Sequence, residues 1–168
     1  KAAMNPCQDA RVRELLAKTR RAYSKRGVVQ DKKSALTRAP LEALLETCDE
    51  SLKGVRDRAL LLFAWSSGGR RRSEVTAANL DNVKKVDART WIFSLTRSKT
   101  DQAGANAANN AKPIVGPAAD ALEAWLKRSG ITSGFIFRRI RRGEKVAEPL
   151  SPAAVRDIVK ERALLAGL

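Results

Sequence analysis

The sequence predicts a mainly α-helical fold with a small three-stranded antiparallel sheet. Several stretches repeat apolar residues at intervals of three and four, the spacing of a helix that packs one face on a core; the clearest runs from Pro117 to Gly130. Three short segments rich in β-branched and aromatic residues, 83–86, 90–95 and 112–115, indicate the strands. The chain has 168 residues and is 43% hydrophobic, which is enough for one buried core.

The first 36 residues are expected to form one helix and a linker. Asp9 can cap a helix over about 10–23, in which apolar residues follow helical spacing on one face. The basic residues in and just after that helix are Arg11, Lys18, Arg20, Arg21 and Lys25. A lone helix cannot bury its apolar face, and residues 26–36 are polar, include a glycine and show no periodicity. We therefore expect 26–36 to link this helix to a larger domain that begins at residue 37.

Two helices and a short third one are expected next. The first begins near residue 37, and its core-facing residues are Leu41, Leu44, Leu45 and Cys48. The second is predicted over about 55–67, and its apolar run 59–65 covers nearly the whole circumference, which is typical of a core helix. The glycines at 68–69 end it, and a short helix over about 72–77 follows.

The remaining elements are a loop, two helices and a basic turn. Residues 104–111 are rich in Ala and Asn and low in complexity, so we expect a loop before the third strand. After the helix that Gly130 ends, the segment 135–137 indicates a short buried run. A basic turn follows, either solvated or in contact with a DNA backbone, and contains Arg138, Arg139, Arg141 and Arg142. Ser151 begins the final helix, whose inward residues are expected to be Val155, Ile158, Val159 and Ala163.

The balance of charge favours nucleic acid as a partner. Lys and Arg total 33 against 18 Asp and Glu, a formal net charge of +15 that suits nucleic acid or an anionic membrane. The basic residues are spread over several elements, however, and no apolar stretch approaches the roughly 20 residues that span a bilayer. Two cysteines are too few for a disulfide framework or a zinc site, which fits a cytoplasmic protein, and the absence of histidine excludes catalytic and metal sites that need one. No metal or other cofactor is expected.

The segment 66–75, Ser-Ser-Gly-Gly-Arg-Arg-Arg-Ser-Glu-Val, is the part of the chain around which the other elements are organised. Guanidinium groups bind phosphate oxygens through paired hydrogen bonds and stay charged at any working pH. From spacing alone, solvated surface charge is an equally good interpretation; the buried helix before the segment favours arginines in fixed positions. Glu74 lies three residues after Arg71 on the same helical face, where its carboxylate can orient the guanidinium; an exposed helix glutamate is the alternative.

Two motifs together resemble a known family. Residues 69–75, Gly-Arg-Arg-Arg-Ser-Glu-Val, resemble the first arginine box of the tyrosine recombinases (phage integrases): a glycine, any residue, then Arg-x-Ser-Glu and an aliphatic residue. Residues 91–95, followed by Arg-Ser-Lys-Thr-Asp-Gln at 97–102, resemble the strand and hairpin that carry the catalytic lysine of that family. The resemblance implies an integrase catalytic core, here incomplete.

The resemblance also implies how the chain is divided. Residues 1–25 would hold the last helix of an N-terminal core-binding domain, 26–36 the linker, and 37–168 the N-terminal part of the catalytic domain. The family places a His-x-x-Arg box and then the nucleophilic tyrosine after a helix like the final one here, and neither has a match; the only tyrosine, Tyr23, precedes the arginine box and is not assigned as the nucleophile. We therefore expect an inactive internal fragment of a longer integrase. Apolar residues left uncovered would favour self-association, and the candidates are Phe63, Trp65 and Leu164.

Chemistry in this family needs no metal or nucleotide. A tyrosine attacks the scissile phosphate and forms a 3′-phosphotyrosyl bond that keeps the energy of the phosphodiester for rejoining. By resemblance, Arg71 would stabilise the charge on the phosphate, Lys99 would protonate the departing 5′ oxygen, and Glu74 would orient Arg71. By base rate a hairpin lysine is merely solvated, and the context of Lys99 favours the catalytic role. The residues expected to contact DNA are Arg70, Arg72, Arg97, Arg20, Arg21, Lys25, Arg138 and Arg139.

Two other interpretations stay open. One is a basic α-helical DNA-binding module without chemistry, and the other is a type IB topoisomerase, which shares this active-site logic. The small size and the hairpin sequence favour a recombinase. By analogy with the family, the full-length protein would act on double-stranded DNA as a homotetramer, associated with the nucleoid of the cytoplasm.

Overall fold

The computed structural model describes residues 5, 9–27, 36–95 and 110–168 and divides the chain into two units, residues 1–35 and 36–168. The first unit contains helix α1 (Ala10–Lys25), which Asp9 caps by accepting a 2.7 Å hydrogen bond from the backbone N–H of Arg11. No residue of α1 is buried, and Leu15, Leu16 and Tyr23 all lie exposed. The helix therefore forms as the sequence predicts, with its apolar face uncovered within its own unit.

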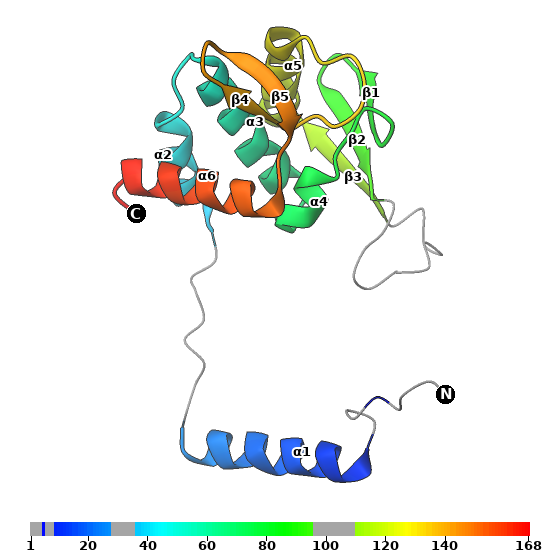
Figure 1. Cartoon of the computed structure of the whole chain (residues 1–168), viewed down its shortest axis with the longest axis vertical. Coiled ribbons are helices and arrows are strands. Elements are labelled where there is room, and N and C mark those ends of the chain that lie inside the picture. Colours follow the sequence, from blue (N-terminus) through cyan, green and yellow to red (C-terminus); the bar gives the residue numbers. More distant parts are fainter. Residues whose placement is uncertain (1–4, 6–8, 28–35, 96–109) are drawn as a thin grey trace. The chain divides into compact units, whose positions relative to one another are not determined.

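The larger unit contains five helices and two antiparallel sheets among its described residues (Figure 1). The helices are α2 (Arg38–Glu46), α3 (Leu52–Ser66), α4 (Arg72–Thr76), α5 (Pro117–Ser129) and α6 (Pro152–Leu165). The three-stranded sheet has the order β1 (Val83–Asp87), β2 (Thr90–Ser94), β3 (Ala111–Val115), and a second sheet pairs β4 (Arg138–Arg141) with β5 (Lys145–Pro149). The prediction of a mainly α-helical fold with a small three-stranded antiparallel sheet is confirmed.

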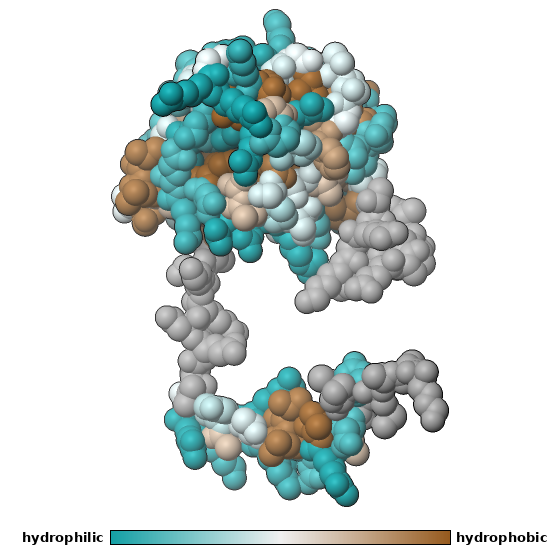
Figure 2. Space-filling model, in the orientation of Figure 1, coloured by the Kyte–Doolittle hydropathy of each residue, from teal (hydrophilic) through white to brown (hydrophobic). Residues whose placement is uncertain are grey.

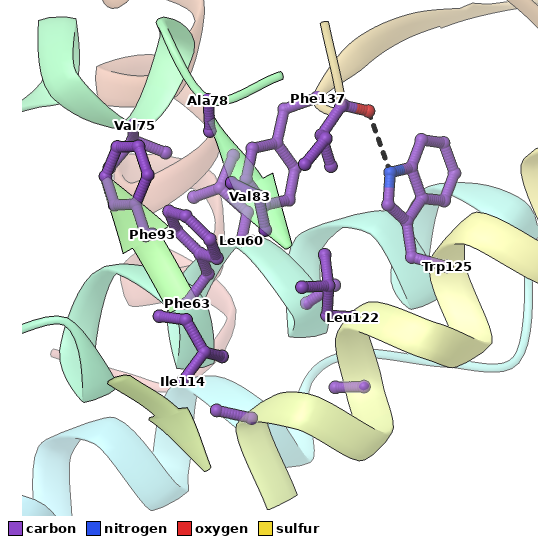
Figure 3. Packing of buried hydrophobic residues seen from close by; sticks show 14 of the residues in the cluster. Leu60, Phe63, Val75, Ala78, Val83, Phe93, Ile114, Leu122, Trp125 and Phe137 are labelled. Atoms are coloured by element: carbon purple, nitrogen blue, oxygen red, sulfur yellow. Dashed lines mark hydrogen bonds between the residues drawn. The ribbon is translucent and has the colours of Figure 1, made fainter. Parts of the chain in front are cut away.

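Helix α3 lies at the centre of the larger unit, between α5 and α6 (Figure 1). Its Phe63 is fully buried, and its ring centroid lies 5.0 Å from that of Phe93 on β2 in a tilted arrangement and 5.3 Å from that of Phe137 in an edge-to-face one (Figure 3). Trp125 of α5 is also fully buried, and its indole N–H donates a 2.9 Å hydrogen bond to the carbonyl of Ile136. A core of this kind holds α3 in place from several sides, so the segment that follows α3 in the sequence begins at a fixed position.

The start of α3 depends on contacts from near and far in the sequence. Ser51 caps it by accepting a hydrogen bond from the N–H of Gly54, so that α3 begins three residues before the predicted start. Glu144, in the turn between β4 and β5, accepts a 2.8 Å hydrogen bond from the N–H of Leu52. A carboxylate at a helix N-terminus satisfies a free N–H and complements the helix dipole. The hairpin is therefore attached to the central helix through Glu144.

A buried ion cluster joins α3 to α6. Asp57 is fully buried; its Oδ1 accepts hydrogen bonds from Arg56 at 2.8 and 2.6 Å, and its Oδ2 accepts two from Arg162 of α6 at 3.0 and 2.7 Å. Arg162 also donates to the carbonyl of Thr47 at the end of α2. One carboxylate thus lies between two buried guanidiniums, and the cluster connects three helices.

Four details of the sequence prediction are wrong. The predicted basic turn at 138–142 is a β-hairpin, because Ile140 and Val146 pack against the main core from its paired strands. Phe135 is exposed, since only the two residues after it point into the core, and Val159 lies at the surface of α6. Phe63, expected to be uncovered, is fully buried by the aromatic contacts described above.

Apolar side chains do reach the surface elsewhere. Trp65 is partly exposed, as expected, and Leu164, Leu165 and Leu168 are exposed at the end of α6, where Figure 2 shows hydrophobic residues beside an otherwise largely hydrophilic face. None of the described helices is long and apolar enough to span a bilayer.

Candidate phosphate-binding site

The site begins where α3 ends. The N–H groups of Gly69 and Arg70 both donate to the carbonyl of Ala64, at 2.9 and 3.2 Å, and reverse the chain direction after the last turn of the helix. Gly68 and Gly69 have φ values of +89° and +69°, a region that glycine adopts without steric cost. The two glycines therefore allow three consecutive arginines to follow directly from a buried helix.

Arg71 and Glu74 form the best-defined pair in this segment. Glu74 is only 10% exposed; its Oε1 accepts a 3.1 Å hydrogen bond from Nη1 of Arg71, and its Oε2 accepts one of 3.1 Å from the backbone N–H of Arg71. The Arg71 side chain is 55% exposed. Because a guanidinium has five N–H donors, the contact with Glu74 leaves donors free to face solvent. The carboxylate fixes the inner side of Arg71 and leaves its outer side available to an anion.

The two neighbouring arginines differ from each other. Arg72 is exposed. Arg70 is only 21% exposed, donates from Nη2 to the carbonyl of Gly68 at 3.1 Å, and places Nη1 at 3.9 Å from Oε2 of Glu74. Its Nε is buried and has no hydrogen-bond partner in the described part of the chain. Of the three arginines, Arg71 and Arg72 are thus the ones that a phosphate can reach readily.

A pocket of about 330 Å³ lies beside this segment. Arg70 and Arg72 form its polar side, and residues from α2, α3, α4 and α6 form its apolar side, among them Trp65 and Val159. Since Val75 on α4 and Val155 on α6 are both buried and both line this pocket, α6 supports the helix that carries Glu74.

The other predicted site residues lie in several places. Lys99 and Arg97 fall outside the described residues. The three on α1, which are Arg20, Arg21 and Lys25, are exposed within the first unit. On β4, Arg138 donates to the carbonyls of Phe135 and Ser133, both at 2.8 Å, and is half-buried.

Arg139 and Arg141 share one partner on the neighbouring strand. Arg139 lies 3.6 Å and Arg141 3.0 Å from carboxylate oxygens of Glu148 on β5, and the two arginines are largely exposed. The pKa of Glu148 is lowered by a hydrogen bond from its own backbone N–H and by the charges of these two arginines. Glu148 is therefore ionised at neutral pH and offsets part of the positive charge of the hairpin, so the hairpin is a weaker anion site than its arginine content suggests.

The chemistry that the arrangement supports is binding of an anion at fixed guanidinium groups. In the described residues, no group of three or more Cys, Asp or Glu side chains gathers as a metal site would require. A phosphate oxygen can accept hydrogen bonds from the outer side of Arg71 with no reorientation, because Glu74 already holds its position. Such an arrangement can hold an anion such as a phosphate group.

Comparison with known proteins identifies the family of the chain. Residues 34–168 match the model of the Phage integrase family. The chain belongs to that family, the tyrosine recombinases. It is also 34% identical, over a 171-residue alignment, to the integrase/recombinase xerD homolog of Selenomonas ruminantium; the alignment covers 98% of this chain and 48% of that protein. The chain thus spans about half the length of the curated relative that it matches.

The sequence did not predict two features of the structure, the different orientations of the three arginines and the long-range contacts to α3. Nothing in the local pattern indicates that Arg70 turns inward while Arg71 and Arg72 turn outward, because the three residues are chemically identical and consecutive. Glu144 and Arg162 contact α3 from 92 and 105 residues away, and no local signal identifies such partners. The hairpin did have a signal, since a glycine in a short polar turn between two alternating segments is typical of one.

Proposed function

We propose that this chain is part of a site-specific DNA recombinase, in which Arg71 binds the phosphate at which a DNA strand is cut and rejoined. The observation that carries the proposal is the Arg71–Glu74 pair: an exposed guanidinium whose inner side is fixed by a nearly buried carboxylate on α4. Membership of the tyrosine recombinase family supports the same reaction class.

The proposed reaction is a transesterification. A tyrosine hydroxyl gives its proton to solvent and its oxygen attacks the scissile phosphorus; the bond from oxygen to phosphorus forms, and the bond from phosphorus to the 5′ oxygen breaks. The charge that develops on the non-bridging oxygens is stabilised by Arg71, and Lys99 gives its proton to the departing 5′ oxygen. Rejoining runs the same steps in reverse, so that no external energy source is consumed. The tyrosine is not assigned to a residue of this chain.

The remaining expectations belong to the same proposal. The DNA is double-stranded, and α1 together with the β4–β5 hairpin adds contacts to its backbone. Residues 1–25 belong to a core-binding domain and 37–168 to the catalytic domain, joined by the linker 26–36. The whole recombinase assembles as a homotetramer on two DNA sites and works in the cytoplasm at the nucleoid.

The test uses the complete coding sequence and a pool of nicked DNA duplexes of random sequence. A nick near the cleavage point lets the short product diffuse away and traps the covalent protein–DNA adduct, which is then counted on a denaturing gel. We expect Arg71→Ala to lower adduct formation by about 100-fold or more, as the loss of one charge-stabilising donor does, and to weaken DNA binding only several-fold.

Arg72→Ala is the matched control. It removes an exposed neighbouring charge, so it should lower the slope of log affinity against log salt by about one unit and leave adduct formation nearly unchanged. A DNA-binding module without chemistry is the second candidate, supported by the net charge of +15. It would be the better account if the wild-type protein binds DNA and forms no adduct, and if Arg71→Ala and Arg72→Ala change the salt slope equally.

A further inference from the structure

The side chain of Arg70 is unusual for an arginine predicted to contact DNA. It is only 21% exposed, and its Nε is buried without a partner in the described residues. Burying an unpaired N–H is unfavourable, so the charged end of the side chain must make compensating contacts. Those contacts identify what Arg70 does.

Both polar contacts that Arg70 makes with described residues are to parts of the site itself. Nη2 donates to the carbonyl of Gly68 at 3.1 Å, inside the glycine turn that reverses the chain after α3. It packs so closely there that a Cβ on Gly68 would lie 3.2 Å from it. Nη1 lies 3.9 Å from Oε2 of Glu74. The guanidinium therefore bridges the turn before Arg71 and the carboxylate after it.

Glu74 lies between the two arginines and interacts with each in a different way. Its Oε1 is bonded to the side chain of Arg71, and its Oε2 is bonded to the backbone N–H of Arg71 and attracted to Arg70. Without the positive charge of Arg70, Oε2 would keep only its 3.1 Å hydrogen bond from the backbone N–H of Arg71, and the carboxylate would be held less firmly against Arg71. At 10% exposure, little water is available to replace that attraction.

We infer that Arg70 is a positioning residue, which holds Glu74 and the glycine turn so that Glu74 in turn holds Arg71 for phosphate. This deepens the proposed function and rests on the role given there to Arg71. It also separates the three arginines: Arg70 acts within the protein, and Arg71 and Arg72 act on the DNA.

The test is a double-mutant cycle on DNA affinity, carried out with the 168-residue chain and a short duplex at several salt concentrations. Arg70→Met keeps an unbranched side chain in the same space and removes the charge. If Arg70 positions Arg71, Arg71→Ala should weaken binding several-fold in the wild-type background. In the Arg70→Met background the fold-loss of affinity should be smaller by a factor of at least three, because contacting residues couple. The salt slope of the double variant should equal that of Arg71→Ala alone, since both substitutions act on the one phosphate contact of Arg71.

Two further variants test whether Glu74 transmits the energetic coupling between Arg70 and Arg71. In a Glu74→Gln background, Arg70→Met should no longer change the effect of Arg71→Ala, because the carboxylate that links them is gone. Arg72→Ala, by contrast, should be additive with Arg71→Ala. Thermal unfolding of Arg70→Met should match the wild type or exceed it, since a buried unpaired donor is removed, and this distinguishes loss of positioning from loss of folding. If Arg70→Met does not fold, Arg70→Leu takes its place in the cycle.

Several results would overturn the inference. Additive effects of Arg70→Met and Arg71→Ala with a fall of about one unit in the salt slope would make Arg70 a phosphate contact. Additive effects with an unchanged slope would make it a packing residue only. Failure of the wild-type chain to bind duplex DNA at all would refute the proposed function and, with it, this role for Arg70, whereas DNA binding with additive effects would refute the role of Arg70 alone.

Discussion

Removal of the Asp57 carboxylate should destabilise the larger unit more than any exposed charge change. Asp57 is 0% exposed and accepts four hydrogen bonds, two from each of Arg56 and Arg162, which are themselves buried. In Asp57→Ala both guanidiniums would remain in the core without their common counter-charge. Breaking a buried ion pair by removing one partner costs about 3–5 kcal/mol, a large part of the roughly 5–15 kcal/mol by which a domain is stable.

The chain contains a matched control for this experiment. Arg156 and Asp157 repeat the same neighbouring Arg–Asp arrangement, with an ion pair of 2.9 Å between side chains that are 52% and 62% exposed. Since exposed pairs contribute about 0–1 kcal/mol, Asp157→Ala should change stability by less than about 1 kcal/mol. The comparison shows the effect of burial together with that of the second arginine partner, Arg162, which is bonded to Asp57.

Urea unfolding followed by tryptophan fluorescence measures the difference. All three tryptophans lie in the larger unit, so the signal reports its unfolding and is insensitive to α1. We expect a lower midpoint for Asp57→Ala with an unchanged slope. Replacing the whole cluster, as Arg56→Met, Asp57→Leu and Arg162→Met together, should recover most of the loss. If Asp57→Ala and Asp157→Ala have equal midpoints, the argument from burial is refuted.

Two further predictions concern contacts that hold the core together. Glu144→Ala should destabilise the larger unit by about 1 kcal/mol, because it removes the carboxylate that accepts from the N–H of Leu52 at the start of α3, and Glu144→Gln, which keeps an acceptor, should cost less; equal urea midpoints for Glu144→Ala and the wild type would contradict this. Trp125→Phe should cost about 1–3 kcal/mol for the lost hydrogen bond to the carbonyl of Ile136, beyond any cost of the smaller ring. Trp91→Phe is its control, because the indole N–H of Trp91 has no partner in the described residues; calorimetric melting should show the smaller loss for Trp91→Phe, and the reverse order would be evidence against the reasoning.

Local patterns were sufficient to predict the helices and the three-stranded sheet. Helix α5 has a regular apolar stripe and Gly130 at its end, and the strands β1 and β2 are short runs of β-forming residues, so propensity and burial agree at each of them. The hairpin of β4 and β5 was missed because four of the residues around its first strand are arginines, whose charge concealed the alternation. Only the pairing of Ile140 with Val146, which both pack against the main core, shows that these residues form strands.

By itself, the sequence determined the family and the residue types of the candidate site. The glycine turn, the arginine box and the spacing of Glu74 from Arg71 are local, and a helix places residues three apart on one face whatever surrounds it. The contact between Arg71 and Glu74 follows from that spacing, and the structure shows it at 3.1 Å.

The tertiary structure decided which charges face solvent and which are enclosed. Arg56, Arg70 and Arg162 look in sequence like any other basic residues, yet the first and last surround a buried aspartate and Arg70 turns inward toward the glycine turn and Glu74. The physical reason is that the free energy of a charge depends on its desolvation and on counter-charges near it. Those partners come from segments up to 105 residues away, so only the folded chain brings them together.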